Sequence, residues 1–155
     1  MRFQIITIAL LAALTLVVGS CKSDEELQPP TPAYLTEGTA SRPTWTVPVK
    51  SYEFYMTVQV QLGDTLANFQ SVGDLMCAII DGEVRTATGP ANTAGVVYFP
   101  LTIGSNDTSG TVTLQYYCER LHRIYSITNW ATFDPSAKPI GEDGIYRPCF
   151  TEIDK

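Results

Sequence analysis

The sequence predicts an all-β fold: an antiparallel β-sandwich of about seven or eight short strands that follows a disordered N-terminal tether. Three observations predict it. Residues 52–62 alternate between apolar and polar side chains, which is the period of a strand with one buried and one solvated face. Short apolar runs follow, separated by Gly, Pro, Asn and Asp. No stretch sustains helical spacing over three turns.

Each further strand is expected where an apolar run lies between turn residues. Residues 75–80 are continuously apolar, as in a strand buried on both faces, and Asp81-Gly82 is a two-residue hairpin signal that returns the chain. Pro100 indicates that its strand lies at a sheet edge or carries a bulge. Beyond 75–80, the expected strands are 83–88, 95–103, 111–118, 123–128, a short one at 131–133 and a closing one at 145–153.

The first twenty residues have the layout of an export signal. Arg2 precedes an almost wholly apolar run, 3–18, and Gly19-Ser20 supply the small residues that a signal protease accepts. The run is shorter than the roughly 20 apolar residues of a spanning helix. Because Cys21 follows directly, the arrangement resembles a bacterial lipoprotein signal with its lipobox. That resemblance implies cleavage before Cys21 and acyl chains, palmitate among them, on the mature N-terminus.

Residues 21–44 are expected to form a flexible, acidic and proline-rich tether, and residues 45–155 the folded domain. The segment has no apolar period with which to offset the entropy of ordering it. The acidic cluster Asp24-Glu25-Glu26 resembles the export signal of Bacteroidota-type surface lipoproteins. That resemblance implies a place in the outer membrane, with the domain facing the cell exterior.

The chain is acidic, which excludes nucleic acid as a partner on electrostatic grounds. Its formal net charge is −6, and loss of residues 1–20, whose one charged residue is Arg2, makes it −7. No cluster of four or more Lys and Arg occurs. Attachment to a membrane is therefore expected through the lipid and not through an anionic surface.

Three cysteines follow Cys21, and export to an oxidising compartment makes one disulfide plausible. Cys118 with Cys149 is the favoured pair, although the sequence leaves the alternatives with Cys77 open. No CxxC spacing occurs and His122 is the single histidine, so no metal site and no cofactor are expected.

Several short motifs recur in the order found in a small β-sandwich module of Bacteroidota-type surface and secreted proteins. The chain resembles this module over about residues 52–133. Val84 and Cys77 depart from its usual cysteine and glycine, and the family has no agreed catalytic residues. The matching segments are Tyr55-Met56-Thr57-Val58, Gly73-Asp74, Ala78 to Glu83 with Arg85, Tyr98 to Ile103, Val112 to Tyr117 and Arg123-Ile124-Tyr125.

The groups that could carry catalysis have simpler explanations, so the chain is expected not to be an enzyme. Asp81 and Glu83 flank a turn beside Arg85, which favours turn chemistry and a local ion pair over a catalytic carboxylate pair. His122 lies beside an expected turn with no nucleophile signalled. Residues 106–110 lack the acidic register of a calcium loop and are interpreted as a solvated turn.

The aromatic residues offer one candidate binding surface. Tyr55, Tyr117 and Trp130 are expected on solvated faces or in a loop, where their rings could stack on a sugar or contact a partner. The alternative is that they simply cover a sheet. Asp64-Thr65-Leu66 is similar to the acceptor of bacterial O-glycosylation, which would place a glycan on Thr65.

Together these features predict a non-catalytic, lipid-anchored cell-surface protein. The resemblance implies an accessory or binding subunit of an outer-membrane nutrient-uptake complex of the SusC/SusD type, with glycan or peptide as ligand. The alternative is a carbohydrate-binding module that uses the aromatic platform.

Overall fold

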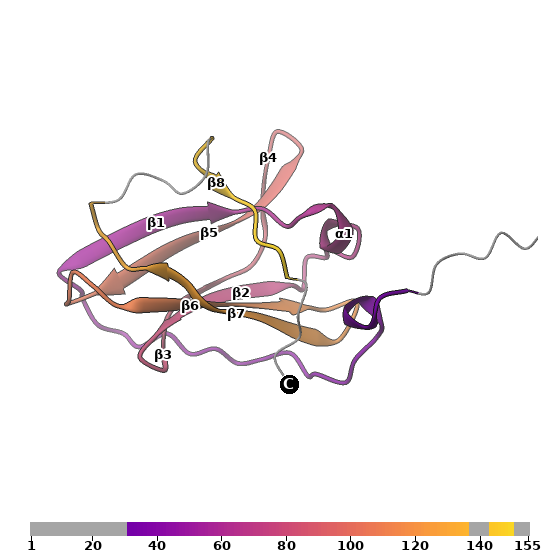
Figure 1. The fold of residues 1–155 in the computed structure, drawn as a ribbon, viewed down its shortest axis with the longest axis horizontal. Helices are drawn as coiled ribbons and strands as arrows, with labels where there is room; N and C mark the ends of the chain where they lie inside the picture. The colour runs from indigo at the N-terminus through magenta and orange to yellow at the C-terminus, as the bar shows by residue number, and fades with distance from the viewer. Residues whose placement is uncertain (1–30, 137–142, 151–155) are drawn as a thin grey trace, which may run out of the picture. The chain divides into compact units, whose positions relative to one another are not determined.

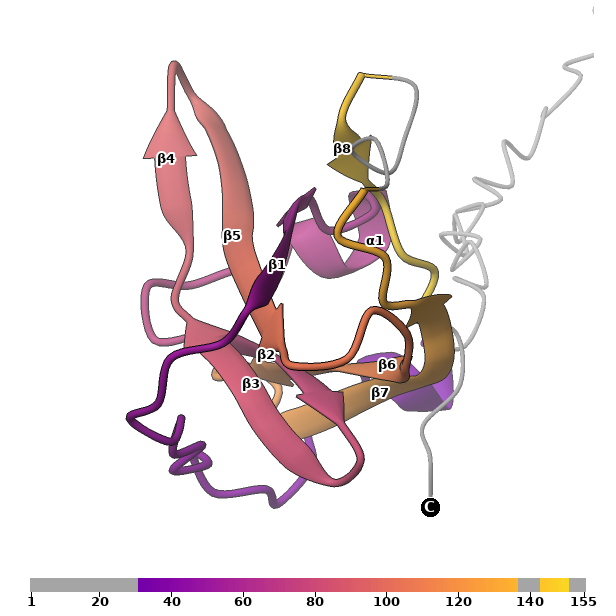
Figure 2. The same ribbon diagram turned by 90° about the vertical axis from the view of Figure 1, so that its left-hand side faces the viewer.

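Two four-stranded sheets pack face to face around the core (Figures 1 and 2). The computed structural model describes residues 31–136 and 143–150. The expected leader, Cys21, residues 21–30 of the tether and the part 151–153 of the closing strand lie outside these ranges. The first sheet has the order β4 (Ala91–Thr93), β5 (Val96–Ser105), β1 (Phe54–Val60) and β8 (Ile145–Tyr146). The second has the order β3 (Glu83–Thr88), β2 (Leu75–Ile80), β6 (Thr111–Cys118) and β7 (Arg123–Thr132).

All strand pairs are antiparallel except β1 with β8, which run parallel over two residues. The predicted all-β sandwich is therefore confirmed. Two short helices that the sequence did not predict complete the described chain: the 3-10 helix η1 (Ala33–Leu35) and the single turn α1 (Asp64–Ala67).

The core follows from the alternation along each strand. On β1, Met56, Val58 and Val60 are buried while Thr57 and Gln59 are exposed, as the period of two predicts. The inward side chains of the other strands complete one cluster: Met76, Ala78 and Ile80 of β2, Phe99, Leu101 and Ile103 of β5, Val112, Leu114, Tyr116 and Cys118 of β6, and Tyr125 of β7.

The Asp81-Gly82 turn has the geometry that its sequence predicts, with φ of 52° and 76° at the two residues. A second hairpin, β4–β5, was missed. Its turn places Ala94 at φ 52° and Gly95 at φ 84°. Alanine is an uncommon residue for that conformation, so the sequence carries no hairpin signal there.

The chain passes from one sheet to the other between β3 and β4. Gly89-Pro90 separates β3, which pairs with β2, from β4, which pairs with β5. Pairing with β4 ends at Tyr98, so at Pro100 the strand β5 is paired on its β1 side alone. The N–H that proline lacks therefore leaves no β4 acceptor unmet.

The strands expected at 123–128 and 131–133 form one strand, β7, as far as Thr132. A register shift against β6 falls between Val112 and Leu114, and Asn129 opposite it has φ 53°. The bulge absorbs the extra residues, so the ladder continues on both sides of it.

The folded unit begins earlier than expected. Residues 31–44, predicted as tether, belong to the same compact unit as the sheets, which starts at Thr31. Residues 36–50, here called the N-terminal strap, run the length of the sandwich from η1 to the start of β1 (Figure 1). The sequence places the start of the domain at residue 45, whereas the contacts of the described chain group residues 31–44 with the sheets.

Candidate functional site

The N-terminal strap is attached at both of its ends. Near η1, Gly38 N donates to Leu121 O at 2.6 Å and Ala40 N donates to His122 O at 2.7 Å, in the turn between β6 and β7. At the far end, Lys50 Nζ donates to the carboxylate of Glu83 on β3. The strap therefore lies along the outer face of the second sheet (Figure 2).

The strap explains why Tyr117 is not part of an aromatic platform. Tyr117 points away from the core, as predicted, yet it is only 3% exposed, and its outer-face neighbour Cys77 on β2 is fully buried. The expectation that Tyr117 is solvated was wrong, because this part of the outer face of the second sheet, along which the strap runs, is buried. Burial also raises the pKa of the Cys77 thiol to about 12, so the thiol stays protonated and unreactive.

Trp130 does not join Tyr55 either. Its ring packs on Tyr146 of β8 with centroids 5.1 Å apart and contacts the core cluster. The contact joins the two sheets at the side of the sandwich where β7 faces β8. Of the three expected platform residues, Tyr55 alone is exposed, at 49%.

The structure instead gathers an aromatic and charged surface around Tyr55, at the end of the sandwich where β1 begins. Tyr52 meets Tyr55 edge to face, with ring centroids 6.3 Å apart. Lys50 Nζ and the Arg85 guanidinium each lie 5.3 Å from the Tyr52 ring centroid, within cation–π range. We call Lys50, Tyr52, Tyr55, Glu83 and Arg85 the Tyr52 surface.

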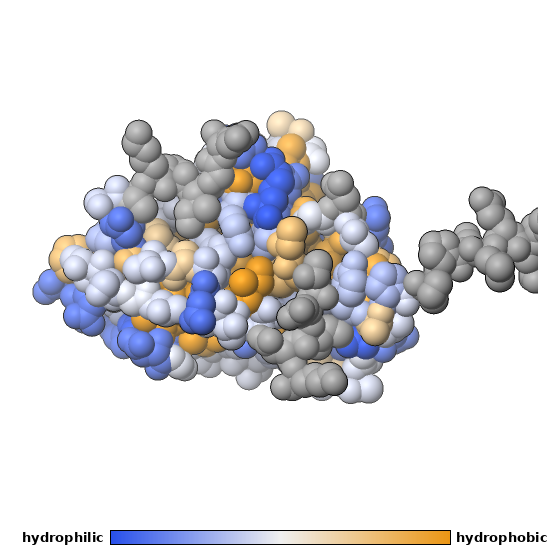
Figure 3. Space-filling view, viewed as in Figure 1, coloured by the Kyte–Doolittle hydropathy of each residue, from blue (hydrophilic) through white to orange (hydrophobic). Residues whose placement is uncertain are grey.

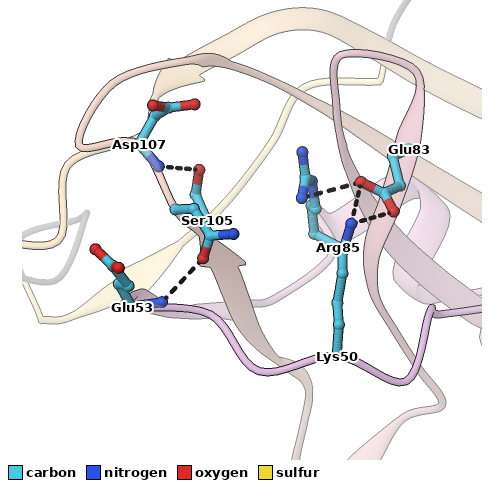
Figure 4. A network of polar contacts seen from close by, with 7 residues as sticks. Lys50, Glu53, Glu83, Arg85, Ser105 and Asp107 are labelled. Carbon is cyan, nitrogen blue, oxygen red and sulfur yellow. Dashed lines mark hydrogen bonds and ion pairs between the residues drawn. The ribbon is translucent and has the colours of Figure 1, made fainter.

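The charges of the Tyr52 surface are organised by Glu83 (Figure 4). Lys50 Nζ reaches its two oxygens at 2.6 and 2.8 Å, and Arg85 Nη1 lies 3.0 Å from it. The bond from Lys50 is the main cause that lowers the pKa of Glu83 and raises the pKa of Lys50. Glu83 and Arg85 thus form the ion pair predicted for this hairpin, and two cations share one carboxylate.

The Tyr52 ring occupies the space that a side chain at position 104 would fill, so its position depends on Gly104. A Cβ at Gly104 on β5 would lie 2.2 Å from the Tyr52 ring, so any side chain there would displace it. In the same cluster, the Tyr52 hydroxyl and Arg85 Nε are buried without a hydrogen-bond partner in the described chain. Such groups cost stability, because burial removes their hydrogen bonds to water without replacing them.

The neighbouring loop 105–110 has a structural role. Asn106 Oδ1 accepts the N–H of Glu53, and Ser105 Oγ accepts the N–H of Asp107 (Figure 4). These side chains close the turn, in agreement with its interpretation as a hairpin loop. Within the described ranges, no group of three or more His, Cys, Asp or Glu is placed to hold a metal ion.

Gly73-Asp74, one of the segments that resemble the β-sandwich module, lies in a buried cluster of hydrogen bonds. The fully buried Asp74 carboxylate accepts bonds from Ser71 N, Tyr116 Oη and Glu119 N at 2.9, 2.7 and 2.9 Å. A Cβ at Gly73 would lie 2.0 Å from the Glu119 carboxylate. The motif therefore joins the loop before β2 to the end of β6. Two adjacent small and acidic residues before an apolar strand were its only sequence signal.

The expected Cys118–Cys149 disulfide is corrected. Both residues, and Cys77, are free thiols in the described chain. Cys118 is buried in the core, where its thiol faces Phe69 O at 3.8 Å, whereas Cys149 is exposed after β8. Cys118 follows the inward phase of β6 into the core, whereas Cys149 is exposed to solvent, so the two thiols lie in different environments.

Thr65 lies on α1 and is exposed, as an acceptor for modification must be. It lines a cavity of about 240 Å³ with Cys149 and Phe150.

His122 is at φ 47° in the β6–β7 turn, and its side chain lies 3.9 Å from Glu37 on the strap. Its backbone carbonyl holds the strap, which gives this residue a structural role.

None of the helices in the described ranges is both long and apolar enough to span a membrane. Comparison with known protein families, with curated proteins and with solved structures finds no significant match in any of the three. Function must therefore be argued from the chain's own residues.

Burial of the Cys77 thiol and of the Tyr125 phenol predicts loss of stability at alkaline pH. The pKa of each is raised to about 12, above the ordinary values of about 9 and 10 that unfolding restores. Between about pH 9 and pH 12 the unfolded chain releases protons that the folded chain keeps, so the free energy of unfolding falls as pH rises. Each group contributes at most about 1.4 kcal/mol per pH unit.

Urea unfolding between pH 8 and pH 11 measures this slope. Tyr125→Phe removes one of the two groups and should flatten the slope, although it also removes the hydrogen bond to Tyr34 O. A slope unchanged in Tyr125→Phe and in Cys77→Ala would contradict the assignment.

Proposed function

We propose that this chain is a non-catalytic, lipid-anchored cell-surface protein that acts as an accessory or binding subunit of an outer-membrane nutrient-uptake complex. The observation that carries the binding role is the Tyr52 surface, which combines an exposed aromatic ring, two cations and a carboxylate. Aromatic and arginine side chains are the residues that most often anchor protein interfaces. A peptide or loop of a partner protein suits such a surface.

The arrangement of the strap supports presentation of this surface away from the membrane. The folded unit starts at Thr31, ten residues after Cys21. A fully extended chain of that length spans at most about 35 Å. The strap then leads from η1 to the opposite end of the sandwich, where the Tyr52 surface lies (Figure 1). Of the described helices and strands, η1 follows Cys21 most closely in sequence.

The exposed apolar residues of the described chain are scattered. Val47 and Val49 on the strap, Val72 after α1 and Val96 at the start of β5 are at least partly exposed, so the exposed valines come from three separate segments. On the face shown in Figure 3, apolar patches alternate with polar ones. This pattern favours a small, mixed contact of the kind that the Tyr52 surface offers over a broad apolar interface.

Two measurements test the proposal, and the first addresses the anchor. Cells that express the full chain are fed an alkyne-labelled palmitate analogue, and Cys21→Ser is compared with the natural sequence. We expect label on the natural chain alone, and label on both or on neither would refute lipid anchoring at Cys21.

The second measurement addresses the partner. A photo-crosslinking amino acid is placed at Tyr55 and, as a matched exposed control near α1, at Asn68. Irradiation of intact cells should join position 55, and not position 68, to an outer-membrane transporter or its associated lipoprotein. Equal crosslinking from both positions would show that the Tyr52 surface is not the docking site.

A further inference from the structure

The strand β7 forms a free edge of the second sheet. Its one strand partner in the described chain is β6, and no backbone hydrogen bond joins residues 124–128 to any other described segment. The ring of Phe150 packs on the buried Tyr125 within the core, with centroids 6.0 Å apart, and does not pair with the strand. A free edge presents a row of backbone donors and acceptors that a further strand can meet.

The other three edge strands of the described sheets have features that discourage such pairing. The strands β4 and β8 have only three and two residues, and Pro90 precedes β4. The strand β3 carries Glu83 and Arg85, and it lies close to β5 of the first sheet. By contrast, β7 has ten residues and no proline, and its one charged residue, Arg123, is bonded to Thr36. The edge of β7 is therefore the one most open to a further strand.

The regular part of this edge is the stretch 124–128. The register of β7 with β6 shifts near Asn129, which ends the stretch on one side. Thr128 is exposed, and the other residues of the stretch except Tyr125 are half-buried. The stretch contains no charged residue, although the chain has a net charge of −6. Two copies of this acidic chain can therefore meet here without bringing carboxylates together.

The stretch is complementary to itself about Ser126. When two copies pair antiparallel with Ser126 opposite Ser126, Ile124 of one copy lies opposite Thr128 of the other. In the same register, Tyr125 lies opposite Ile127. Because side chains alternate along a strand, the first two pairs share the outer face of one continuous sheet and the third lies on its inner face. Hydroxyl pairs and pairs of an aromatic with a β-branched residue are cross-strand pairs that stabilise antiparallel sheets.

We propose that β7 is the interface through which two copies of this chain form a dimer, by antiparallel pairing of residues 124–128 across a two-fold axis at Ser126. The two four-stranded second sheets then join into one sheet of eight strands. The inference is independent of lipid anchoring and of the Tyr52 surface, because it uses none of their residues. About five residues a side are fewer than the roughly 20–30 of a standard interface, so the dissociation constant is expected on the order of 100 µM.

Sedimentation equilibrium of residues 21–155, purified without lipid, measures the association. A reducing agent is present because Cys149 is an exposed free thiol. The mean mass should rise from that of one chain towards that of two between about 10 and about 500 µM. A chain that stays monomeric over this range would overturn the proposal and leave the edge to a strand of a different protein.

Charges introduced at position 126 test the register. Ser126→Lys and Ser126→Glu each place two like charges opposite one another across the two-fold axis, so each variant alone should dimerise about tenfold more weakly. An equimolar mixture of the two variants places a lysine opposite a glutamate and should recover the affinity of the natural chain. Circular dichroism verifies beforehand that each variant is folded.

Thr57→Lys is the matched control for the added charge. Residue 57 is an exposed position on β1, in the first sheet, so this variant should associate as the natural chain does. Folded Ser126 variants that each dimerise as tightly as the natural chain would overturn the proposed interface. A mixture that associates no more tightly than either variant alone would overturn it as well.

Discussion

Replacement of Asp74 by alanine is expected to destabilise the domain by about 4 kcal/mol, the largest effect of any polar substitution in the described chain. The variant leaves Ser71 N, Tyr116 Oη and Glu119 N buried without their acceptor. Each unmet buried group costs about 1–3 kcal/mol, and the values are not additive within one cluster. Urea unfolding monitored by circular dichroism measures the loss.

Two further variants isolate the cause. Asp107→Ala removes an exposed aspartate from the loop after β5 and should change stability by no more than about 0.5 kcal/mol. Asp74→Asn keeps the shape but turns one acceptor into a donor, so about half of the loss is expected. If Asp74→Ala costs less than about 1 kcal/mol, the carboxylate does not have the stabilising role that its three hydrogen bonds indicate.

Replacement of Gly38 by valine is expected to lift the N-terminal strap from the second sheet. A Cβ at this position would lie 2.6 Å from Arg123 Cγ and 2.7 Å from the His122 carbonyl oxygen, and the latter belongs to the backbone and cannot turn aside. The strap then loses its bond to Leu121 and uncovers Cys77. If docking weakens by about 1.4 kcal/mol, the thiol of Cys77 should react about tenfold faster.

Thiol labelling followed by mass spectrometry measures this opening, in a chain with Cys21 and Cys149 replaced by serine. Cys118, buried in the core, is the internal reference and should keep its rate. Thr39→Val is the matched control, because residue 39 is the exposed neighbour of Gly38 on the strap. Faster labelling of both thiols together would indicate global unfolding and not release of the strap.

Local patterns were sufficient to predict most strands. The alternation in β1, the apolar run of β2 and the Asp81-Gly82 turn each depend on residues next to one another in sequence, so the limits of β2, β3 and β6 agree with the prediction. The strand β4 was missed because Ala94 occupies a conformation that alanine rarely adopts. The strands predicted at 123–128 and 131–133 are one strand, β7, with a bulge at Asn129. The sequence did not show this because a bulge depends on the register with the partner strand, here β6.

The candidate site was only partly predictable. The ion pair of Glu83 with Arg85 follows from their spacing on one strand, and the exposure of Tyr55 follows from its phase on β1. Lys50 and Tyr52 join them only because the strap returns to β3 across more than thirty residues. Sequence periodicity carries no information about such a distant contact.

The sequence by itself therefore determined the class of fold, the inward and outward faces of the main strands and the expectation of a lipid anchor at Cys21. Tertiary structure decided what covers each face. Residues 36–50 have no apolar period of their own, yet they bond Leu121, His122 and Glu83 and run along the outer face of the second sheet, on which Tyr117 and Cys77 are buried. Alternation states which way a side chain points, but its exposure depends on whether another segment lies over it, and that is a property of the whole fold.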